Sequence, residues 1–159
     1  MRVVVLAGGY SSERYVSFSS GALIANALIE NGHEVMLLDL YLGNENKDFP
    51  IEYTKKATYS YQIQEAEPNL DNLKKFSNRK ELIGKGVIEL CQETDVVFLA
   101  LHGSIGENGQ LQALFDLYNI SYTGSSYIGC LLAMEKDISK KLMKENNILT
   151  PQWVIAQKI

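Results

Sequence analysis

Short apolar runs alternate with segments of helical periodicity along most of this chain. The apolar runs are continuous, which is typical of strands buried on both faces of a parallel sheet. They predict strands over residues 2–7, 34–39, 95–100 and 120–123. Apolar residues at helical spacing predict helices over residues 16–30, 81–93, 111–117, 128–133 and 134–146. This order predicts an α/β fold, with an open parallel sheet flanked by helices on both faces.

Residues 41–80 interrupt this alternation. The segment is polar, contains Pro50 and Pro68, and is rich in Lys, Asn and Asp towards its end. Long insertions of this kind in compact domains are usually variable decoration or lids. We therefore interpret the segment as an excursion from the sheet that contains short elements of its own.

The first predicted strand runs into a glycine turn that carries polar groups. Gly8 and Gly9 allow a sharp turn and a close approach of the backbone to a ligand, and Glu13 follows just before the first predicted helix. The turn has neither the Gly-Lys-Ser/Thr of a P-loop nor the three spaced glycines of a dinucleotide site. Because a carboxylate repels phosphate and attracts an amine, Glu13 favours an amine ligand. The alternative is a plain strand–helix turn in which Glu13 faces the helix dipole.

A second glycine turn, residues 102–109, follows the third predicted strand. It begins with His102 and contains Glu107. Because the carboxyl ends of parallel strands share one edge of the sheet, we expect both residues to meet Glu13 in one cleft. A hydrogen bond between His102 and Glu107 would orient the imidazole and favour its charged form.

Composition and charge exclude several classes of protein. The formal net charge of −4 gives no electrostatic basis for binding nucleic acid or an anionic membrane surface. No apolar run is long enough to span a bilayer, and no signal-peptide pattern follows Met1. Cys91 and Cys130 lack metal-site spacing, so we interpret both as reduced core thiols of a cytoplasmic protein and expect no metal site in this chain.

Five motifs, taken in order, resemble the D-alanine–D-alanine ligases. They are Gly8-Gly9-x-Ser11-x-Glu13-x-x-Val16-Ser17-x-x-Ser20-Gly21, Leu101-His102-Gly103-x-x-Gly106-Glu107-x-Gly109-x-Leu111-Gln112, Tyr122-Thr123-Gly124-Ser125, Met134-x-Lys136 and Thr150-Pro151. A single glycine motif is weak evidence, whereas five in the family's order are specific. Asn108, where the family most often has Asp, and the bulky Tyr10 and Tyr15 depart from the pattern at positions without assigned chemistry.

The resemblance implies a domain division and an activity for the whole protein. Residues 1–149 would form a Rossmann-like pre-ATP-grasp substrate domain, and residues 150–159 would begin a central ATP-grasp domain. The whole protein would be an ATP-dependent carboxylate–amine ligase that makes the D-alanyl-D-alanine dipeptide for peptidoglycan precursors. In this family ATP phosphorylates the carboxylate of one D-alanine, and the amine of the second substrate attacks the acyl phosphate. D-lactate and D-serine stay open as second substrates.

The same resemblance implies cofactors and partners. ATP and Mg²⁺ would serve the whole protein, while this chain alone is expected to bind neither tightly and to be inactive. D-alanine is the implied small-molecule substrate, and a homodimer is the implied assembly. The residues at 153–156 predict one further strand, which has no later strand to pair with.

Individual residues take roles from the family pattern. Glu13 would hold the ammonium group of the first D-alanine as the catalytic carboxylate, Val16 would border its methyl group, and His102 would reach its carboxylate. The remaining positions come from the motifs alone: Ser17 and Gly103 for substrate binding, Glu107 and Ser20 as their support, and Lys136 for the nucleotide.

Two readings from other classes stay open. A stand-alone amino-acid-binding or regulatory module would use the same cleft, and a reading frame that continues past Ile159 would argue against it. A dinucleotide-dependent dehydrogenase is disfavoured by the glycine patterns. Asp39 is its only candidate for the acidic residue that would hold a ribose at the end of the second strand.

Overall fold

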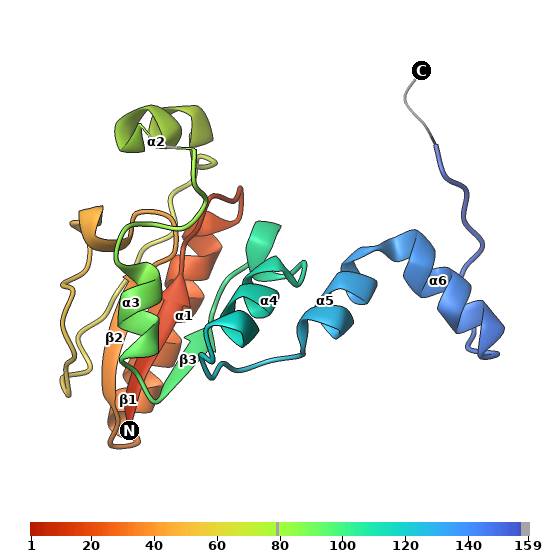
Figure 1. The fold of residues 1–159 in the computed structure, drawn as a ribbon. Coiled ribbons are helices and arrows are strands. Elements are labelled where there is room, and N and C mark those ends of the chain that lie inside the picture. Colours follow the sequence, from red (N-terminus) through yellow and green to blue (C-terminus); the bar gives the residue numbers. More distant parts are fainter. Residues whose placement is uncertain (79, 157–159) are drawn as a thin grey trace.

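The computed structural model describes residues 1–78 and 80–156 and places three parallel strands at the centre (Figure 1). They are β1 (Arg2–Ala7), β2 (Glu34–Asp39) and β3 (Val96–Leu99), in the order β2-β1-β3. The central strand β1 is buried over five of its six residues, which explains its continuous apolar sequence. The parallel sheet and its first three strands are therefore confirmed.

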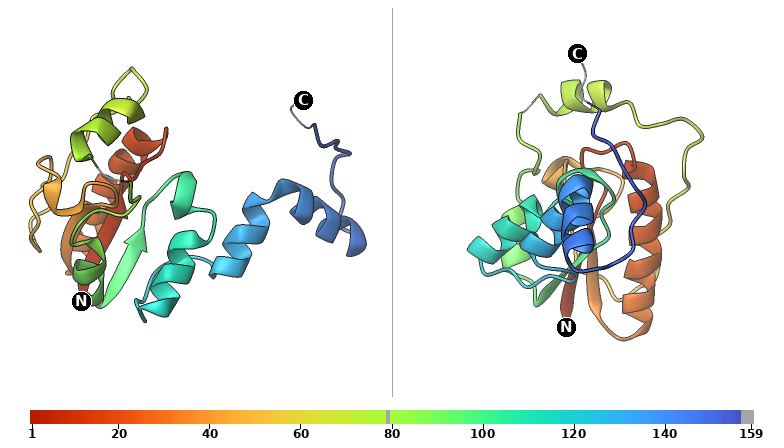
Figure 2. Two further views of the ribbon diagram at one scale, coloured as in Figure 1. Left: turned by 45° about the horizontal axis from the view of Figure 1, so that its top comes forward. Right: turned by 90° about the vertical axis from the view of Figure 1, so that its right-hand side faces the viewer.

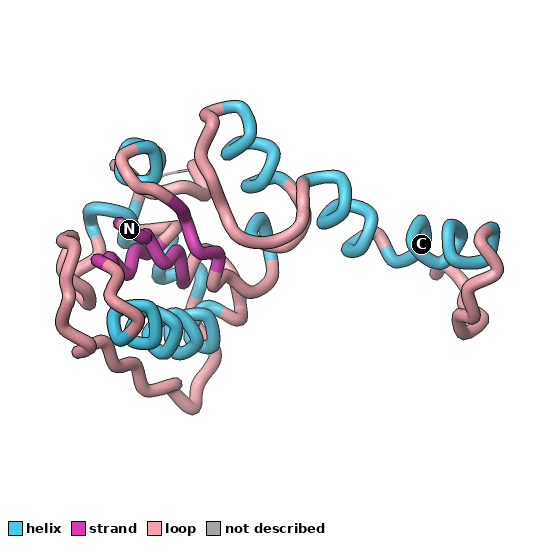
Figure 3. Tube along the Cα trace, turned by 90° about the horizontal axis from the view of Figure 1, so that it is seen from below, coloured by secondary structure: helices cyan, strands magenta, loops and turns pink. Residues whose placement is uncertain are grey.

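Helices cover both faces of the sheet, as predicted (Figure 3). Helix α1 (Arg14–Glu30) packs on one face, and α3 (Val87–Gln92) and α4 (Gln110–Leu117) pack on the other. Alternate residues of β1 supply the two halves of the core: Val3, Val5 and Ala7 face α1, whereas Val4 and Leu6 face α3 and α4. Gly21 lets α1 approach closely, since a Cβ there would lie 2.8 Å from the Cβ of Ala7.

The predicted fourth strand is reduced to a single bridge. Val97 of β3 pairs with Tyr122 in a parallel bridge, and its N–H donates to the carbonyl of Ser121 at 2.8 Å. The next N–H of β3 facing this side, that of Leu99, donates to the Thr123 side chain at 3.1 Å instead of to a backbone carbonyl. Gly124 then turns the chain away with a φ of 116°. Residues 120–123 therefore run beside β3 without forming a strand.

The helix predicted over residues 81–93 forms only as α3, over its second half. The first half forms bends and a turn instead, because the N–H of Gly84 donates to the carbonyl of Leu40 at 2.7 Å. This contact is so close that a Cβ on Gly84 would lie 2.5 Å from the backbone N of Gly43. Gly86, with a φ of 80°, precedes the helix. Residues 81–86 thus cross the end of β2 before α3 begins.

Part of the 41–80 excursion belongs to the core, so the interpretation of this segment as decoration is wrong for its first half. Phe49 and Tyr59 are buried under α1 in the same cluster as Phe18. Asn26 of α1 holds the backbone of Tyr59 by two hydrogen bonds, of 2.7 and 3.1 Å. The second half contains α2 (Leu70–Ser77), none of whose residues is buried.

The last two helices, α5 (Tyr127–Met134) and α6 (Lys136–Glu145), extend away from the sheet (Figures 1 and 2). Neither contains a buried residue, although α5 is strongly apolar. Both were predicted within two residues of their ends. No helix in the described part of the chain combines the length and apolar character needed to cross a membrane.

The strand predicted at residues 153–156 is wrong, because these residues have no regular structure and no described strand lies beside them to pair with. Trp153 instead packs on α6: its indole N–H donates to Asp137 at 2.8 Å, and Lys140 Nζ lies 5.4 Å from the ring centroid. The segment predicted to begin a further domain, residues 150–159, ends with residues 157–159, which lie outside the described residues.

The two cysteines differ in burial, which gives a testable difference in reactivity. Cys91 is buried beneath β3, and this burial raises the pKa of its thiol to about 12. Cys130 is only half-buried. Because the thiolate is the reactive form, a disulfide reagent at neutral pH should modify Cys130 and leave Cys91 intact until denaturant is added. A Cys130→Ser variant should lose the native reaction, and rapid reaction of both thiols in the folded chain would contradict the buried placement.

Candidate functional site

The two glycine turns meet at the carboxyl edge of β1 and β3, as the sequence predicts. Gly103 makes the contact possible: its φ is 68°, and a Cβ there would lie 2.9 Å from Ser11 Oγ and 3.8 Å from Glu13 Oε2. Ser11 in turn orients the first turn, since its hydroxyl accepts a hydrogen bond from the Glu13 N–H at 3.1 Å. The Glu13 carboxylate makes no capping bond to α1 and is exposed towards the second turn.

Glu13, His102 and Glu107 converge at this edge. Their ligand atoms all lie within 4.8 Å of one another, and within the described residues they are the one group of His, Cys, Asp and Glu side chains spaced closely enough to hold a metal ion. The predicted hydrogen bond between His102 and Glu107 is wrong, because Nδ1 and Oε1 lie 3.9 Å apart. The imidazole is instead oriented by Ser20, whose Oγ lies 3.3 Å from Nε2.

The electrostatics of this group suit a small cation. Two carboxylates flank one imidazole, and all three side chains reach solvent. The gap between the two turns is only about 10 Å³, because Leu40, Leu101 and the glycine backbone fill it. A ligand would therefore lie on top of the turns, against the carboxylates, with one side open.

The other predicted site residues lie at different distances from this group. Val16 is 45% exposed on the first turn of α1. Ser17 is fully buried and bridges the structure: it accepts from the Gly8 N–H at 2.8 Å and donates to the Ala100 carbonyl at 2.7 Å. Its hydroxyl therefore holds the ends of β1 and β3 together and does not face a ligand. Lys136 is exposed at the start of α6, away from the sheet (Figure 1).

Sequence reasoning missed a buried ion pair beneath the first turn. The Arg14 guanidinium donates to both carboxylate oxygens of Asp39, and the two side chains are 6% and 0% exposed. Arg14 also donates to the Gly9 carbonyl at 2.9 Å, while Asp39 accepts from the Gly9 N–H at 3.2 Å. Because Asp39 is enclosed and paired, it is not available to a ribose, which removes the main support for a dinucleotide site.

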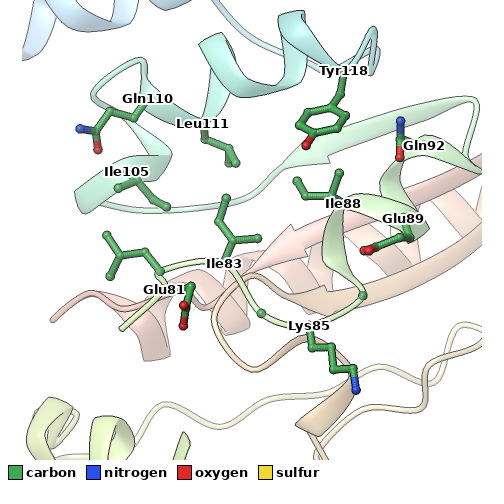
Figure 4. Close-up of a pocket in the computed structure, with 13 residues that line it drawn as sticks. Glu81, Ile83, Lys85, Ile88, Glu89, Gln92, Ile105, Gln110, Leu111 and Tyr118 are labelled. Carbon is green, nitrogen blue, oxygen red and sulfur yellow. The ribbon is translucent and has the colours of Figure 1, made fainter. Parts of the chain in front are cut away.

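A larger hollow lies elsewhere, between the segment before α3 and the helix α4 (Figure 4). It measures about 680 Å³. Ile83, Ile88 and Tyr118 point into it, whereas Lys85 points away (Figure 4). None of the predicted site residues lines it. Its lining is mainly apolar but includes the charged residues Glu81, Lys85 and Glu89. It shares no residue with the converging group of ionisable side chains, so size alone does not make it the functional site.

Comparison with known proteins agrees with the motifs. A family profile described as "D-ala D-ala ligase N-terminus" matches residues 2–125. The chain is 42% identical over 162 residues to a D-alanine--D-alanine ligase of Pediococcus pentosaceus, covering 98% of this chain and 46% of that protein. It is 38% identical over 155 residues to one of Lacticaseibacillus casei, covering 94% and 43%. The chain thus spans less than half the length of these relatives.

Solved structures give the same result for the fold. The crystal structure of a D-alanine--D-alanine ligase from Bacillus anthracis complexed with ATP matches with a TM-score of 0.65 at 27% identity, over 97% of this chain and 37% of that chain. A ligase from Aeromonas hydrophila matches with a TM-score of 0.62 at 18% identity, which supports the fold alone. The profile match and the sequence identities together show that this chain belongs to the D-alanine–D-alanine ligase N-terminal domain family.

Proposed function

We propose that this chain is the part of an ATP-dependent D-alanine–D-alanine ligase that binds the first D-alanine. The observation that carries the proposal is the convergence of Glu13, His102 and Glu107 at the carboxyl edge of the sheet. The names of the relatives supply the substrate class. The proposal includes the division at residue 149, a homodimer of the whole ligase, its cytoplasmic location and its role in making peptidoglycan precursors.

The chemistry of the group matches a zwitterionic amino acid. Glu13 is exposed beside Gly103 and would pair with the ammonium group. His102, held by Ser20 through Nε2, would offer Nδ1 to the carboxylate. Val16 follows Glu13 by three residues and presents a small apolar surface for the methyl group. In this proposal Ser17 acts through the backbone of both turns and does not touch the substrate.

ATP and Mg²⁺ belong to the proposal for the whole ligase. Bound ATP would supply the phosphoryl group that activates the D-alanine carboxylate. Within this chain, the family motif assigns Lys136 to the nucleotide, and its exposed side chain has no hydrogen bond or ion pair with the described residues. Glu13 and Glu107 would repel the nucleotide, which keeps the ATP site separate from the ammonium site.

Titration of the isotope-labelled chain with D-alanine tests the proposal. A few solvent-exposed charge-assisted bonds contribute about 1 kcal/mol or less each, so we expect a dissociation constant in the millimolar range. Signals of both glycine turns should shift, and L-alanine should produce smaller shifts. Glu13→Gln removes the counter-charge of the ammonium and should weaken D-alanine binding by about threefold or more.

Glu65→Gln is the matched control, because Glu65 is exposed in the 41–80 excursion and lies outside the group. It should leave the dissociation constant unchanged. Equal affinity in the Glu13→Gln and Glu65→Gln variants, or shifts confined to α5 and α6, would refute the assignment of Glu13. The chain should not hydrolyse ATP in the presence of D-alanine.

A further inference from the structure

We propose that Gln112, on α4, is a positioning residue for this site. Its side-chain amide holds the 102–109 turn in place, and through that turn it fixes the position of Glu107 relative to His102. The inference takes from the proposed function only the identity of the ligand. The positional claim concerns the free chain and can be tested without any ligand.

The first observation is a buried hydrogen bond between helix and turn. Gln112 is 3% exposed, and its Nε2 donates to the carbonyl of Gly106 at 2.8 Å. Gly106 is the residue directly before Glu107. The bond is thus placed where it can fix the backbone that carries the Glu107 side chain. Hydrogen bonds shielded from water hold geometry more strictly than exposed ones, because water does not compete for the partners.

The second observation is how tightly the turn is seated at this point. A Cβ on Gly106 would lie 2.5 Å from the Cβ of Leu101, so the turn packs directly on the chain two residues past the end of β3. Glu107 itself is anchored to the turn by a longer bond, from its N–H to the Ser104 carbonyl at 3.3 Å. A shift of the Gly106 carbonyl would therefore be passed on to Glu107 and change its 3.9 Å separation from His102.

The third observation is the chemistry of the Gln112 side chain. Its Oε1 is buried and has no hydrogen-bond partner among the described residues. An apolar side chain of the same length would fill the space without burying an unpaired oxygen. The amide therefore gains the fold little net stability, and its specific contribution is the position of the turn.

The chain contains a matched control two residues earlier. Gln110, on the same helix, also bonds the turn: its N–H donates to Asn108 Oδ1 at 3.1 Å, and its Oε1 accepts from Asn108 Nδ2 at 3.2 Å. These bonds are exposed to solvent. Gln110→Met and Gln112→Met thus make the same substitution on the same helix. The first removes an exposed side-chain hydrogen bond to the turn, and the second removes the buried one.

The test uses the isotope-labelled 159-residue chain without ligand. Gln112→Met should speed hydrogen exchange of the Glu107 amide by about tenfold and move the His102 ring signals, while exchange at Val5 in the sheet stays constant. Gln110→Met should change neither by more than about twofold. The proposal is overturned if the two variants behave alike, or if Gln112→Met speeds exchange at Val5 and Glu107 by the same factor.

A measurement on the unmodified chain covers the case in which Gln112→Met does not fold. The side-chain amide protons of Gln112 should exchange at least about tenfold more slowly than those of Gln110, because only the former are buried and bonded. Equal exchange would overturn the proposal. A failure of D-alanine to bind the unmodified chain would refute the proposed function and leave these results standing.

Discussion

Asp39→Asn should lower the free energy of unfolding of this chain by about 3 kcal/mol or more. The substitution keeps the shape of the side chain but leaves the Arg14 guanidinium buried without a counter-charge. It also weakens the acceptor for two backbone groups, the N–H of Gly9 and the N–H of Tyr41, which lie 3.2 and 2.9 Å from Asp39 Oδ1. Equilibrium unfolding in urea measures the loss.

The control for this variant is an ion pair at the surface. Glu34 pairs with Lys55 at 3.0 Å, with both side chains exposed, so Glu34→Gln should leave the urea midpoint almost unchanged. A double variant, Arg14→Met with Asp39→Leu, removes both charges and should recover part of the stability lost in Asp39→Asn. Equal midpoints for Asp39→Asn and Glu34→Gln would show that the buried pair does not anchor the first turn.

Gly8→Ala should destabilise the chain by about 3 kcal/mol, from two separate causes. The backbone of Gly8 has a φ of 72°, a conformation that costs an alanine about 1–2 kcal/mol. In addition, the new methyl group would lie 2.5 Å from Phe18 Cζ and 2.8 Å from Asp39 Oδ1, so the first turn would have to move. Overpacking of this kind costs about 1–3 kcal/mol.

Gly32→Ala separates the two causes. Gly32 has a similar φ of 87°, but a Cβ there would have no heavy atom within 4 Å. Gly32→Ala should therefore lower the free energy of unfolding only by the cost of the backbone conformation. The difference between the two variants then measures the cost of crowding at Gly8. Chemical denaturation of both variants gives the two values. Equal losses would show that the space around Gly8 adapts to a methyl group at no cost.

The sequence was sufficient to predict the strands that are covered by helices on both faces of the sheet. β1, β2 and β3 read as continuous apolar runs because helices cover both sides of the sheet, and the glycine turns follow directly from the strand ends. The meeting of Glu13 with His102 could be predicted for the same reason, since parallel strands end at one edge. Local pattern was sufficient wherever the deciding interactions were local or followed from strand direction.

The features that the sequence did not predict depend on contacts between segments that are far apart along the chain. The buried pair of Arg14 and Asp39 requires the register that sets Ala7 opposite Asp39, which no local pattern specifies. The apolar residues at 81–86 look helical, yet a backbone hydrogen bond from Gly84 to Leu40 holds this segment in bends and a turn. The signal available in the sequence was an arginine at the start of the helix after one strand and an aspartate at the end of the neighbouring strand.

The bond between Leu40 and Gly84 also has a consequence for loop-closure entropy. It ties together the two ends of the excursion, so the intervening chain is a closed loop whose ends stay fixed whatever its length. The entropy cost of such a loop grows only with the logarithm of its length, by about 0.6 kcal/mol for each doubling. Phe49 and Tyr59 fix the first part in the core. Tyr61 also packs on this cluster, and Asn69 caps α2. Residues 62–68 are therefore the stretch in which insertions and deletions disturb neither the sheet nor the two glycine turns.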